Sequence, residues 1–566
     1  MRLPLFVEVI EFAHFRSTLF PLVQFVCNNC EGAGTDCPHI ATNEIVPLQA
    51  SVVKIKKLIQ SLVFLAGIAV VMHPLAEGLP DLGDSADASL SELQEKTIGA
   101  RIMMEIRNDS SYIDDAELSA YIKGLGGRLV AASRGATNNN RREFEFFLLK
   151  DDSINAFALP GGYIGVHSGL LLTSTTEAEL SGVLGHEIAH VLQRHQARGI
   201  DSQKGNTFYQ LLGVAVAVLA SRSNSSSGGQ AAEAAIATTV ALQYQSQLNY
   251  SRDFEREADR MGIQVLARAG FEPVGMVGFF ERMLRANRHN EGKMPQYLLS
   301  HPLTTERIAD MQDRVGALKN ESTKFDGGES PEYKFARAKL RVMSMSASEA
   351  VSFFRTAVAE RTVLRDRADV YGLGLALMRA REFAAAEKEI ATLRSTGARN
   401  GWIDNLAAET QAAQRNWPEA LKIYRAAMLS FPQNRALLYG YVDTLYEANE
   451  VDQALTHVTE QLKNSQDDPR LFELAAKGFE RKNKRMAQHR AIGEAYFRKG
   501  NLVGAVDQLE LASKAKDGDF YEISSTEARL REMKTAFRNR TLLPGEKKDP
   551  ERDRDLKNPL RNTAAR

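Results

Sequence analysis

The feature that most constrains this 566-residue chain is the run His186-Glu187-Ile-Ala-His190, which lies inside an otherwise apolar segment. On a helix, His186 and His190 are one turn apart on the same face, with Glu187 beside them. Two imidazoles and a carboxylate are costly in an apolar interior unless they are paired or bound to a metal. The pattern therefore predicts one Zn²⁺ per chain, held by the two histidines, with Glu187 placed to contact a metal-bound water.

The third metal ligand is expected from a charged segment further along the chain. Glu255 and Asp259 are four residues apart, so a helix places both on one face. Glu255 can complete a set of two histidines and one carboxylate, and Asp259 can accept the spare ring N–H of a ligand histidine. A solvated charged helix is the alternative for such a run, and Glu257 is the second candidate for the ligand.

A second group of polar residues follows at Ser300-His301-Pro302 and Arg307. Either His301 or Arg307 can bind the oxyanion of a tetrahedral intermediate if it lies near the open zinc position. His301 can instead ligate zinc at rest and exclude water, and a simple helix cap would account for Pro302 but not for His301.

Two further positions after His190 exclude a related arrangement. Metzincins require glycine and histidine where this chain has Gln193 and Gln196. His195 falls off the ligand face of a continuous helix, and we expect it at the surface.

Upstream of the zinc helix, residues 142–149 and 163–167 have the patterns of β-strands. An exposed strand beside the zinc helix can bind an extended peptide through main-chain hydrogen bonds, which do not depend on sequence. We expect such substrate binding at Tyr163, Ile164 and Gly165.

The N-terminal region contains the pattern of a secretory signal, because Lys54, Lys56 and Lys57 precede about 15 apolar residues. The apolar stretch is short for a spanning helix, although a membrane anchor is the alternative. We expect residues 1–52 to be a non-native extension and residues 53–76 to be a signal peptide. All three cysteines precede residue 40, so the mature chain would suit an oxidising compartment.

Two apolar segments, residues 207–220 and 231–242, flank a hinge rich in serine and glycine. A packed helical hairpin is the first interpretation, and peripheral contact with a membrane is the second. Charge is balanced at 71 basic and 71 acidic residues, so nothing indicates nucleic-acid binding.

The C-terminal half repeats. Ala386, Ala420 and Ala454 are each 34 residues apart, which is the period of tetratricopeptide repeats. We expect an α-solenoid over residues 330–540, with a register break near residues 482–490 and a concave surface for protein partners. Residues 541–566 are charged and are expected to be disordered.

Several motifs together resemble peptidase family M48 over roughly residues 90–320. They are His186-Glu-x-x-His190, Ser251-Arg-x-x-Glu255-x-x-x-Asp259, His301-Pro-x-x-x-x-Arg307 and Asn155-Ala-Phe-x-x-Pro-Gly-Gly. The resemblance implies a zinc endopeptidase domain, assigned to residues 77–325, in which Glu187 is the general base and His301 and Arg307 assist. The expected fold is mainly α: a zincin-like domain with a small β-sheet, followed by the repeat solenoid.

An exported M48-like domain joined to such repeats resembles proteases of the Gram-negative periplasm. The resemblance implies degradation of unfolded or misassembled outer-membrane proteins, chaperone-like help in their assembly, and contact with the β-barrel assembly machinery through the repeats. The alternative function is a chaperone or scaffold whose zinc site is structural or latent. A membrane-anchored protease facing the periplasm is a further alternative.

Overall fold

The computed structural model describes residues 90–134, 142–202, 252–289, 295–319, 329–360, 366–395 and 399–539. The chain divides into two compact units, Met1–Leu82 and Gly83–Arg566, and every described residue belongs to the second. The expected N-terminal extension, signal peptide, apolar segments at 207–242 and C-terminal tail lie outside the described residues. No described helix is both long and apolar enough to cross a membrane.

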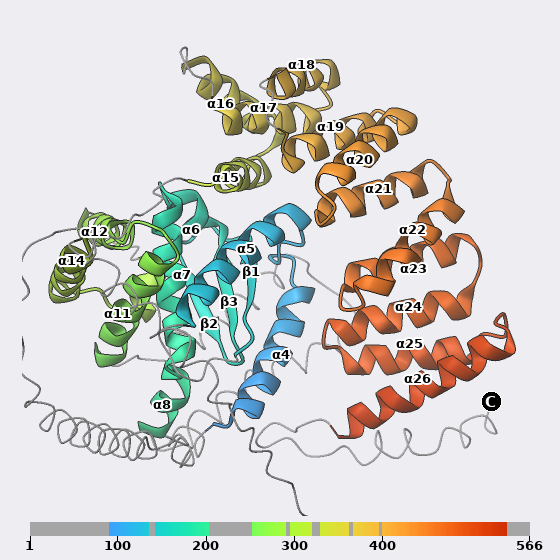
Figure 1. Ribbon diagram of the computed structural model, residues 1–566, viewed down its shortest axis with the longest axis horizontal. Coiled ribbons are helices and arrows are strands. Elements are labelled where there is room, and N and C mark those ends of the chain that lie inside the picture. Colours follow the sequence, from blue (N-terminus) through green and yellow to red (C-terminus); the bar gives the residue numbers. More distant parts are fainter. Residues whose placement is uncertain are drawn as a thin grey trace, which may run out of the picture. The chain divides into compact units, whose positions relative to one another are not determined.

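The first part of this unit is helical with one small sheet, which confirms the predicted fold class (Figure 1). Its elements are α4 (Glu92–Asn108), α5 (Ala116–Ser133), β1 (Glu145–Leu149), β2 (Ala156–Leu159), β3 (Tyr163–His167), α6 (Ser168–Thr173), α7 (Glu177–Leu192), α8 (His195–Ser202), α11 (Arg252–Arg268), α12 (Val274–His289), α13 (Gln296–Ser300) and α14 (Thr305–Lys319).

The sheet has the strand order β1-β3-β2, with β1 parallel and β2 antiparallel to the central strand β3. Gly165, for example, pairs with Phe147 on one side and Phe157 on the other. The main chain of β3 is therefore paired along both edges, and the prediction that Tyr163, Ile164 and Gly165 bind a substrate strand is wrong. The edge strand that contacts α7 is β2.

The helix that carries the His-Glu-x-x-His motif, α7, crosses α11 at two glycines. A Cβ atom on Gly262 would lie 3.1 Å from the backbone nitrogen of His186, and one on Gly185 would lie 3.2 Å from the carbonyl oxygen of Gly262. A Cβ atom at either position would require the helices to move apart by a few tenths of an ångström, so glycine suits this close approach. The crossing brings the acidic face of α11 against the histidines of α7.

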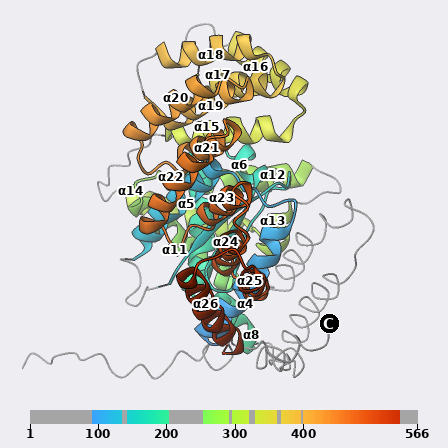
Figure 2. The same ribbon diagram turned by 90° about the vertical axis from the view of Figure 1, so that its right-hand side faces the viewer.

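The second part consists of helices that follow one another along an arc (Figures 1 and 2). They are α15 (Pro331–Ser344), α16 (Ala347–Glu360), α17 (Arg367–Arg379), α18 (Phe383–Ser395), α19 (Gly401–Ala413), α20 (Trp417–Ser430), α21 (Arg435–Glu447), α22 (Val451–Asn464), α23 (Pro469–Arg481), α24 (Arg485–Arg498), α25 (Leu502–Lys514) and α26 (Phe520–Arg538).

The 34-residue period is visible in the backbone. Left-handed residues close the turns after α17, α19, α21 and α23, and they stand 34 residues apart at Arg381, Arg415, Asn449 and Asn483. Because Asn483 keeps this spacing, the predicted register break at 482–490 is wrong. The interruption comes at Gly500, a left-handed residue only half a period later.

The repeats pack against the first part of the unit, since α15 and α21 both contact α5. At this contact the buried Lys339 lies 2.7 Å from Asp115 and 2.6 Å from Glu117. Burial raises the pKa of the Glu117 carboxyl to about 8. The positive charge of Lys339 lowers this pKa, whereas the nearby carboxylate of Glu409 raises it further.

We expect the stability of this contact to fall as the pH rises. A carboxyl whose pKa is raised in the folded state binds its proton more tightly there than in the unfolded chain. Its contribution is complete below pH 4.5 and is lost as the pH rises through about 8. Unfolding midpoints measured by circular dichroism should therefore decrease over this range in the wild type and change less in Glu117→Gln. The exposed Glu306→Gln is the matched control, and an unchanged profile in Glu117→Gln would contradict the assignment.

Candidate active site

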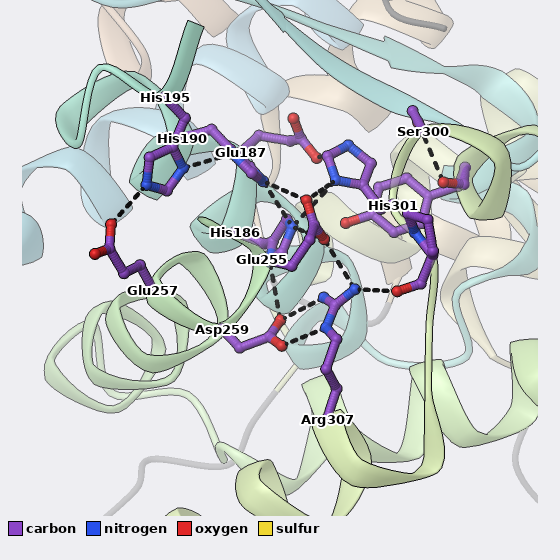
Figure 3. Close-up of polar contacts among 12 residues, drawn as sticks. His186, Glu187, His190, His195, Glu255, Glu257, Asp259, Ser300, His301 and Arg307 are labelled. Atoms are coloured by element: carbon purple, nitrogen blue, oxygen red, sulfur yellow. Dashed lines mark hydrogen bonds and ion pairs between the residues drawn. The ribbon is translucent and has the colours of Figure 1, made fainter. Parts of the chain in front are cut away.

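Four segments bring the predicted site residues to one buried point (Figure 3). The segments are α7, α11, the residue that follows α13, and the first turn of α14. In that order they supply His186, Glu187 and His190, then Glu255 and Asp259, then His301, and finally Arg307. Threonine 176 caps α7, and its side chain accepts a hydrogen bond from the backbone of Glu179, which fixes where this helix begins.

Two imidazoles and one carboxylate converge. The Nε2 atoms of His186 and His190 are 3.0 Å apart. The carboxylate of Glu255 lies 3.5 Å from the first and 3.3 Å from the second. Together with His301, these residues place one possible ligand atom each within 4.8 Å of one another.

The polar contacts of the two rings test whether this set fits a metal ion. His186 Nδ1 lies 3.1 Å from Asp259, and His190 Nδ1 lies 2.8 Å from the ring of His195. When each Nδ1 carries the ring proton, both Nε2 atoms turn lone pairs toward each other and toward the Glu255 carboxylate. Such converging lone pairs repel unless a cation lies among them, so the residues fit a metal.

A proton can take the place of that cation. Burial by itself would lower the pKa of His186, but hydrogen bonds to Asp259 and Glu255 outweigh burial and raise it to about 9. Burial would raise the pKa of Glu255, but His301, His186 and His190 together hold it well below its usual range. The carboxylates of Asp259 and Glu255 therefore favour a positive charge on the ring of His186.

Arg307 does not face a cleft. Its Nε and Nη2 atoms donate to Asp259 at 2.7 and 2.8 Å, and Nη1 lies 2.8 Å from Glu255 and 2.7 Å from the Pro302 carbonyl. The guanidinium is 4% exposed. Since its donors are directed at protein oxygens, the expected role in oxyanion binding does not fit, and Arg307 instead holds the carboxylates in place.

His301 extends from the end of α13 into the cluster. Its Nδ1 lies 3.0 Å from Glu255 and 3.4 Å from His186 Nε2, and its Nε2 lies 3.4 Å from Glu187. The ring is stacked on Tyr297 with centroids 4.6 Å apart. This geometry matches the alternative in which His301 supplies a fourth ligand.

Glu187 is 1% exposed, and burial raises the pKa of its carboxyl. Among the described residues, none makes a hydrogen bond to its Oε1, although Nε2 of His301 lies 3.4 Å from this atom. A buried carboxylate next to a metal position can take a proton from a water molecule.

Two residues near the site were misplaced by sequence reasoning. His195 is fully buried, not at the surface, because Arg194 adopts a left-handed conformation (φ 52°) and redirects the chain after α7. Glu257 is not a ligand, since its carboxylate lies 2.9 Å from His195 Nε2 and 2.8 Å from Arg198. No glycine marks the turn at Arg194, so the periodic pattern gave no signal of it.

Comparisons with known proteins agree with this geometry. The model of peptidase family M48 matches residues 118–315, and a tetratricopeptide-repeat model matches residues 411–478. The β-barrel assembly-enhancing protease of Escherichia coli (strain K12) is 31% identical over 447 residues, which are 79% of this chain and 89% of that protein. The protein of the same name from Yersinia pestis is 30% identical over 464 residues, 81% of this chain and 92% of that protein.

A shorter relative matches the first part alone. The metalloprotease YcaL of Escherichia coli (strain K12) is 29% identical over 233 residues, which are 41% of this chain and 84% of that protein. The match to both kinds of relative, the coverage of the longer ones and the buried His186/His190/Glu255/His301 cluster lead to one conclusion. The chain belongs to peptidase family M48 and is a metalloprotease whose catalytic domain is followed by tetratricopeptide repeats.

Proposed function

We propose that this chain is a zinc endopeptidase that cleaves unfolded or misassembled outer-membrane β-barrel proteins in the periplasm. The observation that carries the proposal is the buried convergence of donors from His186, His190 and Glu255 beside the carboxylate of Glu187. Two histidines and one carboxylate form a ligand set typical of catalytic zinc.

Each residue has a role in this proposal. Bound zinc would supply Lewis acidity toward a peptide carbonyl. Glu187 would take a proton from the attacking water and deliver it to the leaving amine. Asp259 would fix the tautomer of His186. The positive guanidinium of Arg307 would offset the repulsion between the carboxylates of Asp259 and Glu255.

The substrate strand is proposed to lie along β2, the edge strand that contacts α7. At present the side chain of Gln196 donates to the carbonyl oxygen of Ala158 in this strand at 2.7 Å. A peptide pairing with β2 at this position would replace that hydrogen bond with one from its own main chain.

The substrate class is inferred from the longer relatives, whose printed name is β-barrel assembly-enhancing protease. The periplasmic location is inferred from the signal-like pattern of residues 53–76. We extend this to the present chain, with residues 53–76 as the signal peptide, 77–325 as the peptidase domain and 330–540 as the repeats. The repeats would contact the β-barrel assembly machinery, because helical-repeat arrays present extended surfaces to protein partners.

A second candidate function rests on His301. With its ring among the other ligands, the site has no open position for water, and the protein would then act as a chaperone or scaffold with a latent site. In this state His301 must move away before cleavage can occur.

We expect His301→Ala to cleave an unfolded outer-membrane β-barrel protein about tenfold faster than the wild type, because the resting state would no longer be blocked. Elemental analysis should find one zinc ion per chain in both proteins, since three ligands remain. Lost cleavage with retained zinc would favour the oxyanion role for His301. Absence of both zinc and cleavage in both proteins would refute the proposed function.

A further inference from the structure

The two ligand histidines of α7 are oriented by different partners (Figure 3). His186 reaches the carboxylate of Asp259 directly, at 3.1 Å. His190 instead contacts a second imidazole, with its Nδ1 atom 2.8 Å from Nδ1 of His195. His195 Nε2 in turn lies 2.9 Å from Glu257. We propose that His195 and Glu257 are positioning residues, forming a chain that fixes His190 in the tautomer and ring orientation required for metal binding.

The proposal rests on the proposed zinc site, and the proton positions along the chain follow from it. His190 must turn the lone pair of Nε2 toward the metal, so its Nδ1 carries the proton and donates it to His195. His195 must then accept at Nδ1, which places its own proton on Nε2. The carboxylate of Glu257 accepts that proton, so every nitrogen in the chain has a defined role.

The local backbone is shaped for this contact. On a continuous helix, a residue five positions after His190 would point elsewhere, but the left-handed Arg194 ends α7 and starts α8 in a new direction. Arg194 is itself held by hydrogen bonds to Glu95 and to the carbonyl oxygen of Leu90. Glu95 of α4 therefore helps to hold Arg194, and with it the neighbouring His195, in position.

The ring of His195 is also held in plane. It is stacked on Phe254 with centroids 4.5 Å apart and an interplanar angle of 6°. Arg198 lies over the same phenylalanine at 4.6 Å and binds Glu257 at 2.8 Å. His195 and Arg198 come from α8, whereas Phe254 and Glu257 come from α11, so the chain joins the two helices next to the metal ligands.

Packing alone would not need the nitrogens of His195. An apolar ring could stack on Phe254 equally well, yet this fully buried imidazole contacts a polar partner at each nitrogen. Outer hydrogen bonds of this kind change metal affinity by about 10–100-fold when they are removed. We therefore expect the His195–Glu257 chain to set how tightly zinc is held.

The test compares two substitutions of His195 in a Glu187→Gln background, where no cleavage is required. His195→Phe keeps a ring on Phe254 but offers His190 no acceptor, whereas the amide of His195→Gln can accept from His190 and donate to Glu257. Competition with a chromophoric chelator should show a zinc dissociation constant about 10–100-fold higher for His195→Phe, with most of the affinity restored in His195→Gln. The absorption spectrum of the cobalt-substituted protein should change in parallel.

Two controls separate this role from folding. Phe254→Leu removes the stacking but not the hydrogen bonds, and it should change zinc affinity less than His195→Phe does. Unfolding of the zinc-free variants, followed by circular dichroism, reports any general loss of structure. Equal zinc affinity in the wild type and His195→Phe would overturn the proposal, as would equal losses in His195→Phe and His195→Gln. If the wild-type protein binds no zinc, both the proposed function and the role of His195 fail. If the wild-type protein binds zinc and cleaves substrate, the His195 variants test the role of His195 alone.

Discussion

Replacing Glu187 by glutamine should lower the rate of peptide-bond cleavage by about a thousandfold while zinc stays bound. The amide has nearly the same shape as the carboxylate but cannot accept a proton from water, and general acid–base catalysis contributes about 10²–10⁴ in rate. The imidazoles of His186 and His190 and the carboxylate of Glu255 are unchanged, so the affinity for zinc should remain. Cleavage of an unfolded β-barrel protein and zinc content should be measured on the same samples.

Asp253→Asn is a suitable control for this experiment, because that carboxylate is 83% exposed and belongs to α11 near the site. It should cleave as the wild type does. Cleavage retained in Glu187→Gln would remove Glu187 from the mechanism. Loss of zinc together with loss of cleavage would place Glu187 among the ligands instead.

The second large effect is expected from Arg307→Leu. The substitution leaves the carboxylates of Asp259 and Glu255 buried, 1% and 2% exposed, without the guanidinium that now contacts both. Removing one partner of a buried ion pair typically costs about 3–5 kcal/mol. We expect a loss of this size in the free energy of unfolding of the zinc-free protein, measured with urea, and a smaller loss in the presence of zinc, whose charge replaces that of Arg307.

A double-mutant cycle sharpens this prediction. In Asp259→Asn with Arg307→Leu, the unpaired charge on residue 259 is removed, so the combined loss of stability should be smaller than the sum of the single losses. Additive losses would show that Arg307 and Asp259 do not act together. A loss for Arg307→Leu that is equally large with and without zinc would argue that the guanidinium is not balancing the charge of the ligand set.

Much of the site follows from helical spacing. The pairs His186/His190 and Glu255/Asp259 are four residues apart, and the structure brings both pairs together as the spacing predicts. Helical spacing could not predict which residues contact each of these helix faces, because those contacts depend on how distant segments pack. Arg307 illustrates this, since its pairing with Asp259 across two helices converts an expected cleft residue into a buried support.

The misplaced elements have equally local causes. The pattern of residues 163–167 correctly predicted a strand, but strand order is set by tertiary pairing, and β3 became the centre of the sheet. His195 was misplaced because a non-glycine residue, Arg194, adopts a left-handed conformation. In the repeats, the spacing of buried alanines predicted the 34-residue period as far as Ala454. The left-handed residue Asn483 shows that the period continues for one more turn, where the alanine spacing gave no signal.

The contact between Gly185 and Gly262 has a consequence for how the protein acquires its metal. Because α7 and α11 pack closely at Gly185 and Gly262, beside the ligand His186, we expect the spacing of these helices to change little when an ion binds. We therefore expect the protein to lose or exchange its ion without unfolding, unlike small domains whose fold forms only around the metal.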